Sequence, residues 1–131
     1  MGDRRDVGLL LLRLGMGGMF VYHGLPKLLG GPAGWERLGH ATRSVGVDFA
    51  PTLFGFMAGV AEAGGGLCLA LGVLQGPALG LLLTTMTVAT ANHLQHGDGL
   101  GKASHAIEAA IVFASLLLIG PGRHVLTRRG S

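Results

Sequence analysis

Long apolar segments alternate with short polar breaks along the chain. A membrane-spanning helix needs about 20 apolar residues to cross about 30 Å of hydrocarbon. Four segments reach this length, at about residues 7–25, 52–74, 77–96 and 103–119. Because short connections join them, the pattern predicts an all-α integral membrane four-helix bundle with up-down-up-down topology. We expect residues 1–131 to form one membrane domain.

The breaks carry residues that end or start helices. The apolar run from Phe49 to Asn92 is too long for one span and long enough for two, and Leu74-Gln75-Gly76-Pro77 divides it with a tight turn. Gly120-Pro121-Gly122 ends the fourth segment. No small-x-small cleavage motif follows the first segment, so we expect a span there rather than a cleaved signal peptide.

The polar stretch of residues 32–48, between the first two spans, has a helical period. Less polar residues recur every three or four positions, opposite charged ones: Trp35, Leu38, Thr42 and Val45 against Glu36, Arg37, His40 and Arg43. This pattern predicts a short helix lying at the membrane interface, with Trp35 as its anchor. An ordinary polar loop is the alternative.

Composition supports lipid as the solvent. The 131 residues are 49% hydrophobic and 13% charged, whereas roughly a quarter of residues in soluble domains are charged. So few charges could not cover the surface of a small globule. The lipid bilayer is therefore the first expected partner.

The basic balance does not indicate nucleic-acid binding. The net charge is +3, but no run of Lys and Arg is longer than two residues and none alternates with aromatic residues. The single cysteine, Cys68, excludes an internal disulfide and a C-x-x-C pair.

Lys and Arg also give a weak orientation signal. One side would carry Arg4, Arg5, Arg123, Arg128 and Arg129, and the other Lys27, Arg37, Arg43 and Lys102. The positive-inside rule then places both termini in the cytoplasm.

The chain has 25 glycines, and those within the apolar runs predict close helix packing. We expect it at Gly15, Gly18, residues 55–59, residues 64–66, Gly76 and Gly80. The sequence leaves open whether some of these positions join copies in a homo-oligomer.

Ionisable residues within the spans are costly and need partners. Arg13 and Glu62 fall near the middle of the first and second spans. Their opposite charges predict a buried structural pair.

A second set of ionisable residues falls at the outer ends of three spans. Neighbours three or four positions apart share a helix face: His23 with Lys27, His93 with His96, and His105 with Glu108. We therefore expect a polar layer near the outer surface, with Glu62 just beneath it.

Several chemistries could use this layer. His, Lys and a carboxylate can bind quinone carbonyls and carry the protons of quinone reduction. A metal site is a weaker reading, since His-x-x-His alone is unspecific, and we expect none. A proton or solute path lined by Thr84, Thr85, Thr87 and Thr90, or a polar cap that orders the outer loops, remains open.

The ordered motifs resemble those of the DoxX family of small four-helix membrane proteins of bacteria and archaea. They are Arg13-Leu14, His23-Gly24-Leu25-Pro26-Lys27-Leu28, Glu62-Ala63-Gly64-Gly65-Gly66-Leu67, His93, Glu108 and Gly120-Pro121-Gly122-Arg123. The resemblance covers nearly the whole chain. It implies a multi-pass protein of the plasma (inner) membrane.

The resemblance also implies a redox role. Relatives include a subunit of an archaeal thiosulfate:quinone oxidoreductase and partners in oxidative-stress complexes. The lone Cys68 departs from the related methylamine-utilisation and vitamin K epoxide reductase types, which use two thiols. The sequence has no haem pair, flavin motif or iron–sulfur ligand set, so electrons would come from a redox partner protein or stay on a quinone.

These lines together predict the membrane subunit or accessory protein of a quinone-linked oxidoreductase, and leave open whether the chain is itself catalytic. The residues expected at the quinone or proton site are His23, Lys27, His93 and Glu108, with His96 and His105 as further cofactor contacts. The alternative is a non-enzymatic scaffold or a small-solute or proton transporter that uses the same layer.

Overall fold

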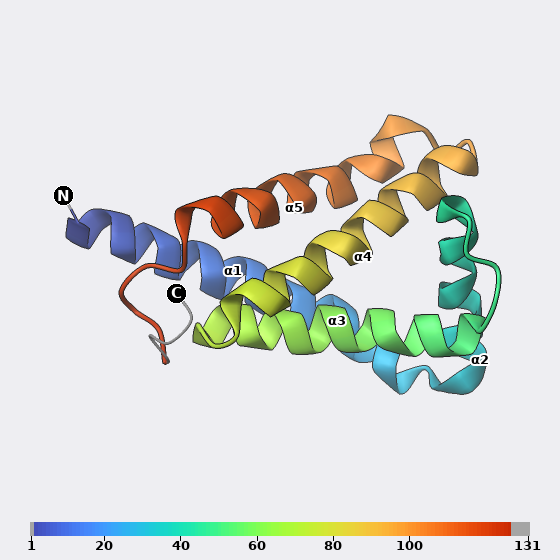
Figure 1. Ribbon diagram of the computed structural model, residues 1–131, viewed down its shortest axis with the longest axis horizontal. Helices are drawn as coiled ribbons and strands as arrows, with labels where there is room; N and C mark the ends of the chain where they lie inside the picture. Colours follow the sequence, from blue (N-terminus) through green and yellow to red (C-terminus); the bar gives the residue numbers. More distant parts are fainter. Residues whose placement is uncertain (1, 127–131) are drawn as a thin grey trace.

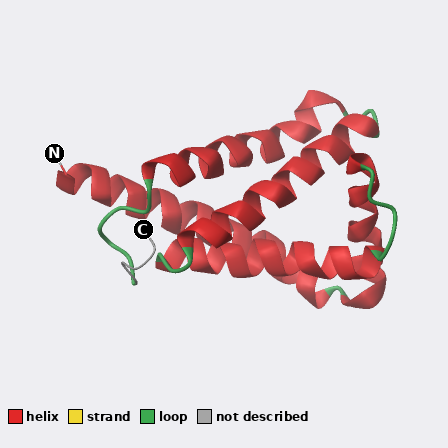
Figure 2. Cartoon of the chain, in the orientation of Figure 1, coloured by secondary structure: helices red, strands yellow, loops and turns green. Residues whose placement is uncertain are grey.

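The computed structural model describes residues 2–126, and every regular element in that range is helical (Figures 1 and 2). The prediction of an all-α protein is therefore confirmed. In chain order the elements are α1 (Gly2–Leu29), α2 (Gly31–Gly39), the 3-10 helix η1 (His40–Val45), α3 (Pro51–Leu71), α4 (Gln75–Gln95) and α5 (Gly99–Ile119). Arg128 and Arg129, used for the orientation prediction, lie outside the described residues.

Successive long helices run in opposite directions. In Figure 1 the chain passes from left to right along α1 and α4, and from right to left along α3 and α5. α2 and η1 lie at the right-hand end, beside the start of α3 and the end of α4. The stretch expected as a short interfacial helix thus folds as these two consecutive helices.

Three helices, α1, α3 and α5, are long and apolar enough to cross a membrane. α4 is also 21 residues long, but four threonines and a polar C-terminal end make it less apolar. Many large apolar side chains point outward from the helices, such as Leu118, which is 89% exposed. An outer surface of this kind suits contact with lipid.

Helix ends follow local turn chemistry. Gly72 ends α3 in the left-handed conformation (φ 75°). Its N–H donates to the Cys68 carbonyl, with an N···O distance of 2.9 Å. α4 begins at Gln75, two residues before the expected start, because Pro77 fits within the first turn, where no backbone donor is needed. α5 begins at Gly99 rather than near residue 103, and ends before Gly120 as its sequence predicts.

Glycines bring α1 and α3 into backbone contact. A Cβ atom on Gly17 would overlap the Gly66 carbonyl oxygen, and one on Gly66 would lie 2.7 Å from the Gly17 oxygen. The prediction that Gly15 and Gly18 make such contacts is wrong, because a Cβ on either would meet nothing within 4 Å. Gly17 lies on the other face of the helix, toward α3.

The same correction applies to α4, where Gly76 and Gly80 also face open space. In α3 the prediction of close packing at residues 55–59 is confirmed. Gly55 lies directly against the Trp35 carbonyl of α2, and Gly59 lies against Leu28 of α1. α2 therefore packs on the N-terminal half of α3 through small residues.

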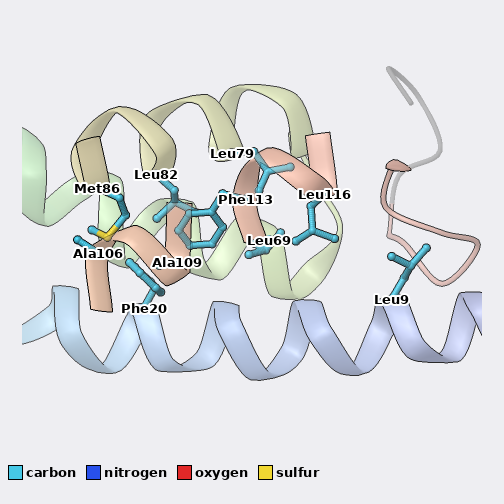
Figure 3. Packing of buried hydrophobic residues seen from close by; sticks show 10 residues of the cluster. All are labelled: Leu9, Phe20, Leu69, Leu79, Leu82, Met86, Ala106, Ala109, Phe113 and Leu116. Carbon is cyan, nitrogen blue, oxygen red and sulfur yellow. The ribbon is translucent and has the colours of Figure 1, made fainter. Parts of the chain in front are cut away.

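The apolar core joins all four long helices (Figure 3). At its centre Phe20 of α1 and Phe113 of α5 meet edge to face, with ring centroids 4.9 Å apart. The other members of the buried cluster are Leu9, Leu69, Leu79, Leu82, Met86, Ala106, Ala109 and Leu116.

Arg13 is buried, but its partners are backbone carbonyls. Its guanidinium donates to Leu69 O (3.0 Å) and Ala70 O (3.1 Å) in the last turn of α3. It also donates to Pro121 O (3.1 Å) and His124 O (2.7 Å), beyond α5. The side chain, 1% exposed, thus supplies donors and positive charge where a helix end leaves carbonyls unpaired. The predicted Arg13–Glu62 pair is wrong.

A substitution at Gly17 tests the α1–α3 contact. We expect Gly17→Ala to lower the free energy of unfolding by about 2 kcal/mol, because the methyl group meets backbone atoms that cannot move aside. Thermal unfolding in a mild detergent measures this change. Gly18→Ala is the matched control, since it meets no neighbour and gains helix propensity. Equal losses for both variants would contradict the packing described.

Candidate functional site

Glu62 of α3 forms an ion pair with Lys27 in the last turn of α1. Lys27 Nζ lies 2.5 Å from Glu62 Oε2. The Glu62 side chain is 4% exposed, whereas that of Lys27 is 35% exposed. A carboxylate buried in this way is stabilised mainly by its cation, so the pair forms a unit.

The local sequence explains why the two charges meet. A Cβ on Gly24 would lie 2.8 Å from Glu62 Cβ, so the missing side chain lets α1 approach α3 at this level. Lys27 follows three residues later on the same helix face. The His-Gly-x-x-Lys motif thus combines a contact glycine with the lysine that it brings to Glu62.

A polar cavity of about 610 Å³ lies between α1, α4 and α5. Its ionisable lining residues are His23, Lys27, Glu62, His93, Lys102, His105 and Glu108. Apolar side chains, among them Met19, Phe20 and Val112, form much of the remaining wall.

An apolar cavity of about 370 Å³ lies on the other side of the ion pair, beneath α2 and η1 and against α3 and α4. Its walls include Leu38, Phe54, Met57, Ala58 and Leu81. Lys27 and Glu62 line both cavities, as do Met86 and Ala89. The ion pair therefore lies between a polar and an apolar space.

Five of the six residues expected at the quinone or cofactor site line the polar cavity: His23, Lys27, His93, His105 and Glu108. His96 does not line it. Its Nδ1 lies 2.7 Å from the Asn92 carbonyl of its own helix, and the side chain is exposed. His96 follows His93 by three residues, but the helix ends at Gln95, so the shared-face argument fails there.

His93 has a second contact outside the cavity. Its Nδ1 lies 2.9 Å from Asp98 Oδ2, across the turn that joins α4 to α5. This hydrogen bond is the main cause that lowers the pKa of Asp98 below its usual value. Asp98 therefore holds the His93 ring in place beside the polar cavity.

The threonines of α4 are mostly occupied by their own helix. Thr84, Thr85, Thr87 and Thr90 each place Oγ1 2.8 Å from the carbonyl four residues earlier. Thr84 and Thr85 line the apolar cavity rather than the polar one. The expectation of a threonine-lined path through the polar layer is not met.

Sequence reasoning missed some features of the site. Lys102, which precedes the expected fourth span, lies in the first turns of α5 and lines the polar cavity. The Lys27–Glu62 pair was also missed. The sequence places Glu62 near the middle of one span and Lys27 at the outer end of another, so the two residues were not expected to lie at the same depth. Within residues 2–126, no three His, Cys, Asp or Glu side chains lie close enough together to hold one metal ion.

The arrangement can bind a partly polar molecule and exchange protons with it. Imidazole, ammonium and carboxyl groups from four helices face one space, and each can donate a hydrogen bond or transfer a proton. The apolar wall beside them can contact a ring or a hydrocarbon chain.

Comparison with known proteins gives one family match. The model of the DoxX family matches residues 8–95 of the chain. The matched range contains the Lys27–Glu62 pair and ends at the last residue of α4. No curated protein matches the sequence, and no solved structure matches it either.

A double substitution tests the ion pair. Glu62→Ala leaves the Lys27 ammonium without its counter-charge, and we expect it to lower the free energy of unfolding by about 2 kcal/mol, less than for a fully buried pair because Lys27 keeps solvent contact. Lys27→Met in the Glu62→Ala background should recover part of this loss.

The control for this cycle is Arg13→Leu in the Glu62→Ala background. Arg13 has separate partners, so the two losses should add. Recovery by Arg13→Leu, measured as thermal stability in detergent, would overturn the assignment of Glu62 to Lys27.

Proposed function

We propose that this chain, which belongs to the DoxX family, is the membrane subunit or accessory protein of a quinone-linked oxidoreductase. The polar cavity would bind the quinone ring. The observation that carries this proposal is the meeting of hydrogen-bonding groups from α1, α4 and α5 in one space with an apolar wall. DoxX is a membrane family often linked to oxidoreductases and redox stress, which supports the same direction.

Quinone reduction takes two electrons and two protons and yields a quinol. In this proposal His23 and Lys27 of α1 bind one carbonyl, and His93 of α4 with Glu108 of α5 binds the other. Each pair of side chains can donate a proton to the carbonyl oxygen that it binds. The electrons come from a redox partner protein.

The apolar wall would hold the ring between these donors. Met19 and Phe20 of α1 and Val112 of α5 contribute to this wall. Aromatic and thioether side chains give favourable contacts to a flat ring. His105 and Lys102 then lie at the outer edge, where they can exchange protons with water.

The proposal also places the chain in the membrane. α1, α3, α4 and α5 would cross the plasma membrane of a bacterium or archaeon as an up-down-up-down bundle, with both termini in the cytoplasm. α2 and η1 would then lie at the outer surface. The Trp35 indole N–H donates to the carbonyls of Lys27 and Leu28, with an N···O distance of 3.1 Å to each. These hydrogen bonds hold α2 at the end of α1, which supports a position of α2 at the membrane surface.

A proton or small-solute path is the second candidate function. The Lys27–Glu62 pair lies between two cavities, and a carboxylate in that position can receive a proton from one side and release it to the other. Proton uptake by liposomes that contain only this protein would favour the second candidate.

Quinone binding by variants of the polar cavity tests the first candidate. The protein, in nanodiscs loaded with a short-chain quinone, is washed and extracted, and bound quinone is measured by chromatography. We expect His93→Ala and Glu108→Ala each to weaken binding about tenfold, because each removes one hydrogen bond to a quinone carbonyl.

His96→Ala is the matched control, because His96 lies on the same helix but outside the cavity. It should bind quinone as the unmodified protein does. If His93→Ala and His96→Ala behave alike, or if no quinone binds at all, the proposal is wrong.

Cysteine labelling tests the orientation. In a Cys68→Ser background, Asp98→Cys in the α4–α5 turn should react with a membrane-impermeant maleimide in intact cells. Gly76→Cys, at the opposite end of α4, should react only after the cells are opened. Both positions are exposed, so access to reagent depends on the side of the membrane. The reverse labelling pattern would place the termini outside.

A further inference from the structure

We infer that the apolar cavity beneath α2 and η1 is a second binding site, which shares the Lys27–Glu62 pair with the polar cavity but lies on the other side of that pair. Its ligand would be a neutral, lipid-soluble molecule with a hydrocarbon body and one carbonyl group at its end. The proposal does not depend on quinone binding in the polar cavity.

The walls indicate the hydrocarbon body. Apart from the ion pair and three threonines, the side chains that line this space are apolar. The cavity, of about 370 Å³, falls in the size range of small-molecule sites, roughly 300–1,000 Å³. α1, α2, η1, α3 and α4 all contribute residues to its walls, and the cavity is partly open to the surroundings of the protein.

The three threonines offer little to a polar ligand. Thr84 and Thr85 donate to the carbonyls of Gly80 and Leu81 in their own helix. Thr42 Oγ1 lies 2.9 Å from both the Gly39 and Val47 carbonyl oxygens. Because a hydroxyl has one proton, these groups have no donor left for a ligand.

Lys27 is then the donor that the cavity offers. Its ammonium has three protons, and one of them is directed at Glu62 Oε2. The side chain lines the cavity and keeps 35% of its surface exposed. A carbonyl oxygen at the end of an otherwise apolar molecule can accept one of the remaining protons.

The ion pair also determines the charge of the ligand. Lys27 and Glu62 are the charged residues in the lining, and their charges cancel. A carboxylate would meet Glu62 as a like charge in a low-dielectric space, and an amine would meet Lys27 in the same way. A neutral acceptor avoids both costs, so we assign the site to a neutral carbonyl compound.

Three matched photoreactive probes test this inference in nanodiscs. All carry the same diazirine-bearing chain, which ends in a methyl ketone, in a plain hydrocarbon or in a carboxylate. All three are used at about pH 9, where the carboxylate is ionised. Labelled peptides are mapped by mass spectrometry to the residues that line the cavity, such as Met57 and Ala58. We expect the ketone to reach half-maximal labelling at about tenfold lower concentration than the other two probes.

Two variants identify the cause. Ala58→Leu narrows the cavity and should reduce labelling by all probes at these peptides. Lys27→Met with Glu62→Gln keeps the site neutral but removes the ammonium, and should abolish the preference for the ketone. His93→Ala, which belongs to the polar cavity, should leave ketone labelling unchanged.

The inference is wrong if the carboxylate labels as well as the ketone in the unmodified protein. It is also wrong if Ala58→Leu leaves labelling of the cavity peptides unchanged. Because the quinone experiment uses His93 and Glu108 instead, failure of one proposal leaves the other standing.

Discussion

The close contact between α1 and α3 is the constraint on which the rest of the structure depends. Gly17, Gly24 and Gly66 remove the side chains that would otherwise hold the two backbones apart. In a membrane, helices gain little from hydrophobic burial against one another, so tight packing and polar contacts must hold them together. This contact brings Lys27 next to Glu62. It thereby places the ion pair between the two cavities.

Two charged side chains are buried within residues 2–126, and they are stabilised in different ways. Arg13, with a planar group of five donors, binds four carbonyls at the end of α3 and beyond α5. Glu62 has one close cation, Lys27, which is itself partly exposed. The Arg13 site has its hydrogen bonds satisfied and suits a structural role. The Lys27–Glu62 site keeps free donors and access to two cavities, which suits a functional one.

The Lys27–Glu62 pair lies between a polar cavity and an apolar one. Lys27 and Glu62 can each be reached from both spaces, because both residues line both cavities. The His93–Asp98 contact extends the polar side toward the α4–α5 turn. His93 and the Lys27–Glu62 pair thus line one cavity, which reaches the α4–α5 turn.

The sequence by itself determined the helical class, the division of residues 49–92 into two helices and the end of α5, and it singled out Arg13, Lys27 and Glu62. Span length, the glycine and proline residues that end α5, and the cost of charges in lipid are local properties that a linear pattern expresses. Partner choice was not determined, since helix rotation and depth decide which faces meet. Tertiary structure selected Gly17 over Gly15 and Gly18, paired Glu62 with Lys27 instead of Arg13, and left His96 outside the polar cavity. The apolar cavity also arose only there, because it needs α2 and η1 folded over two distant helices.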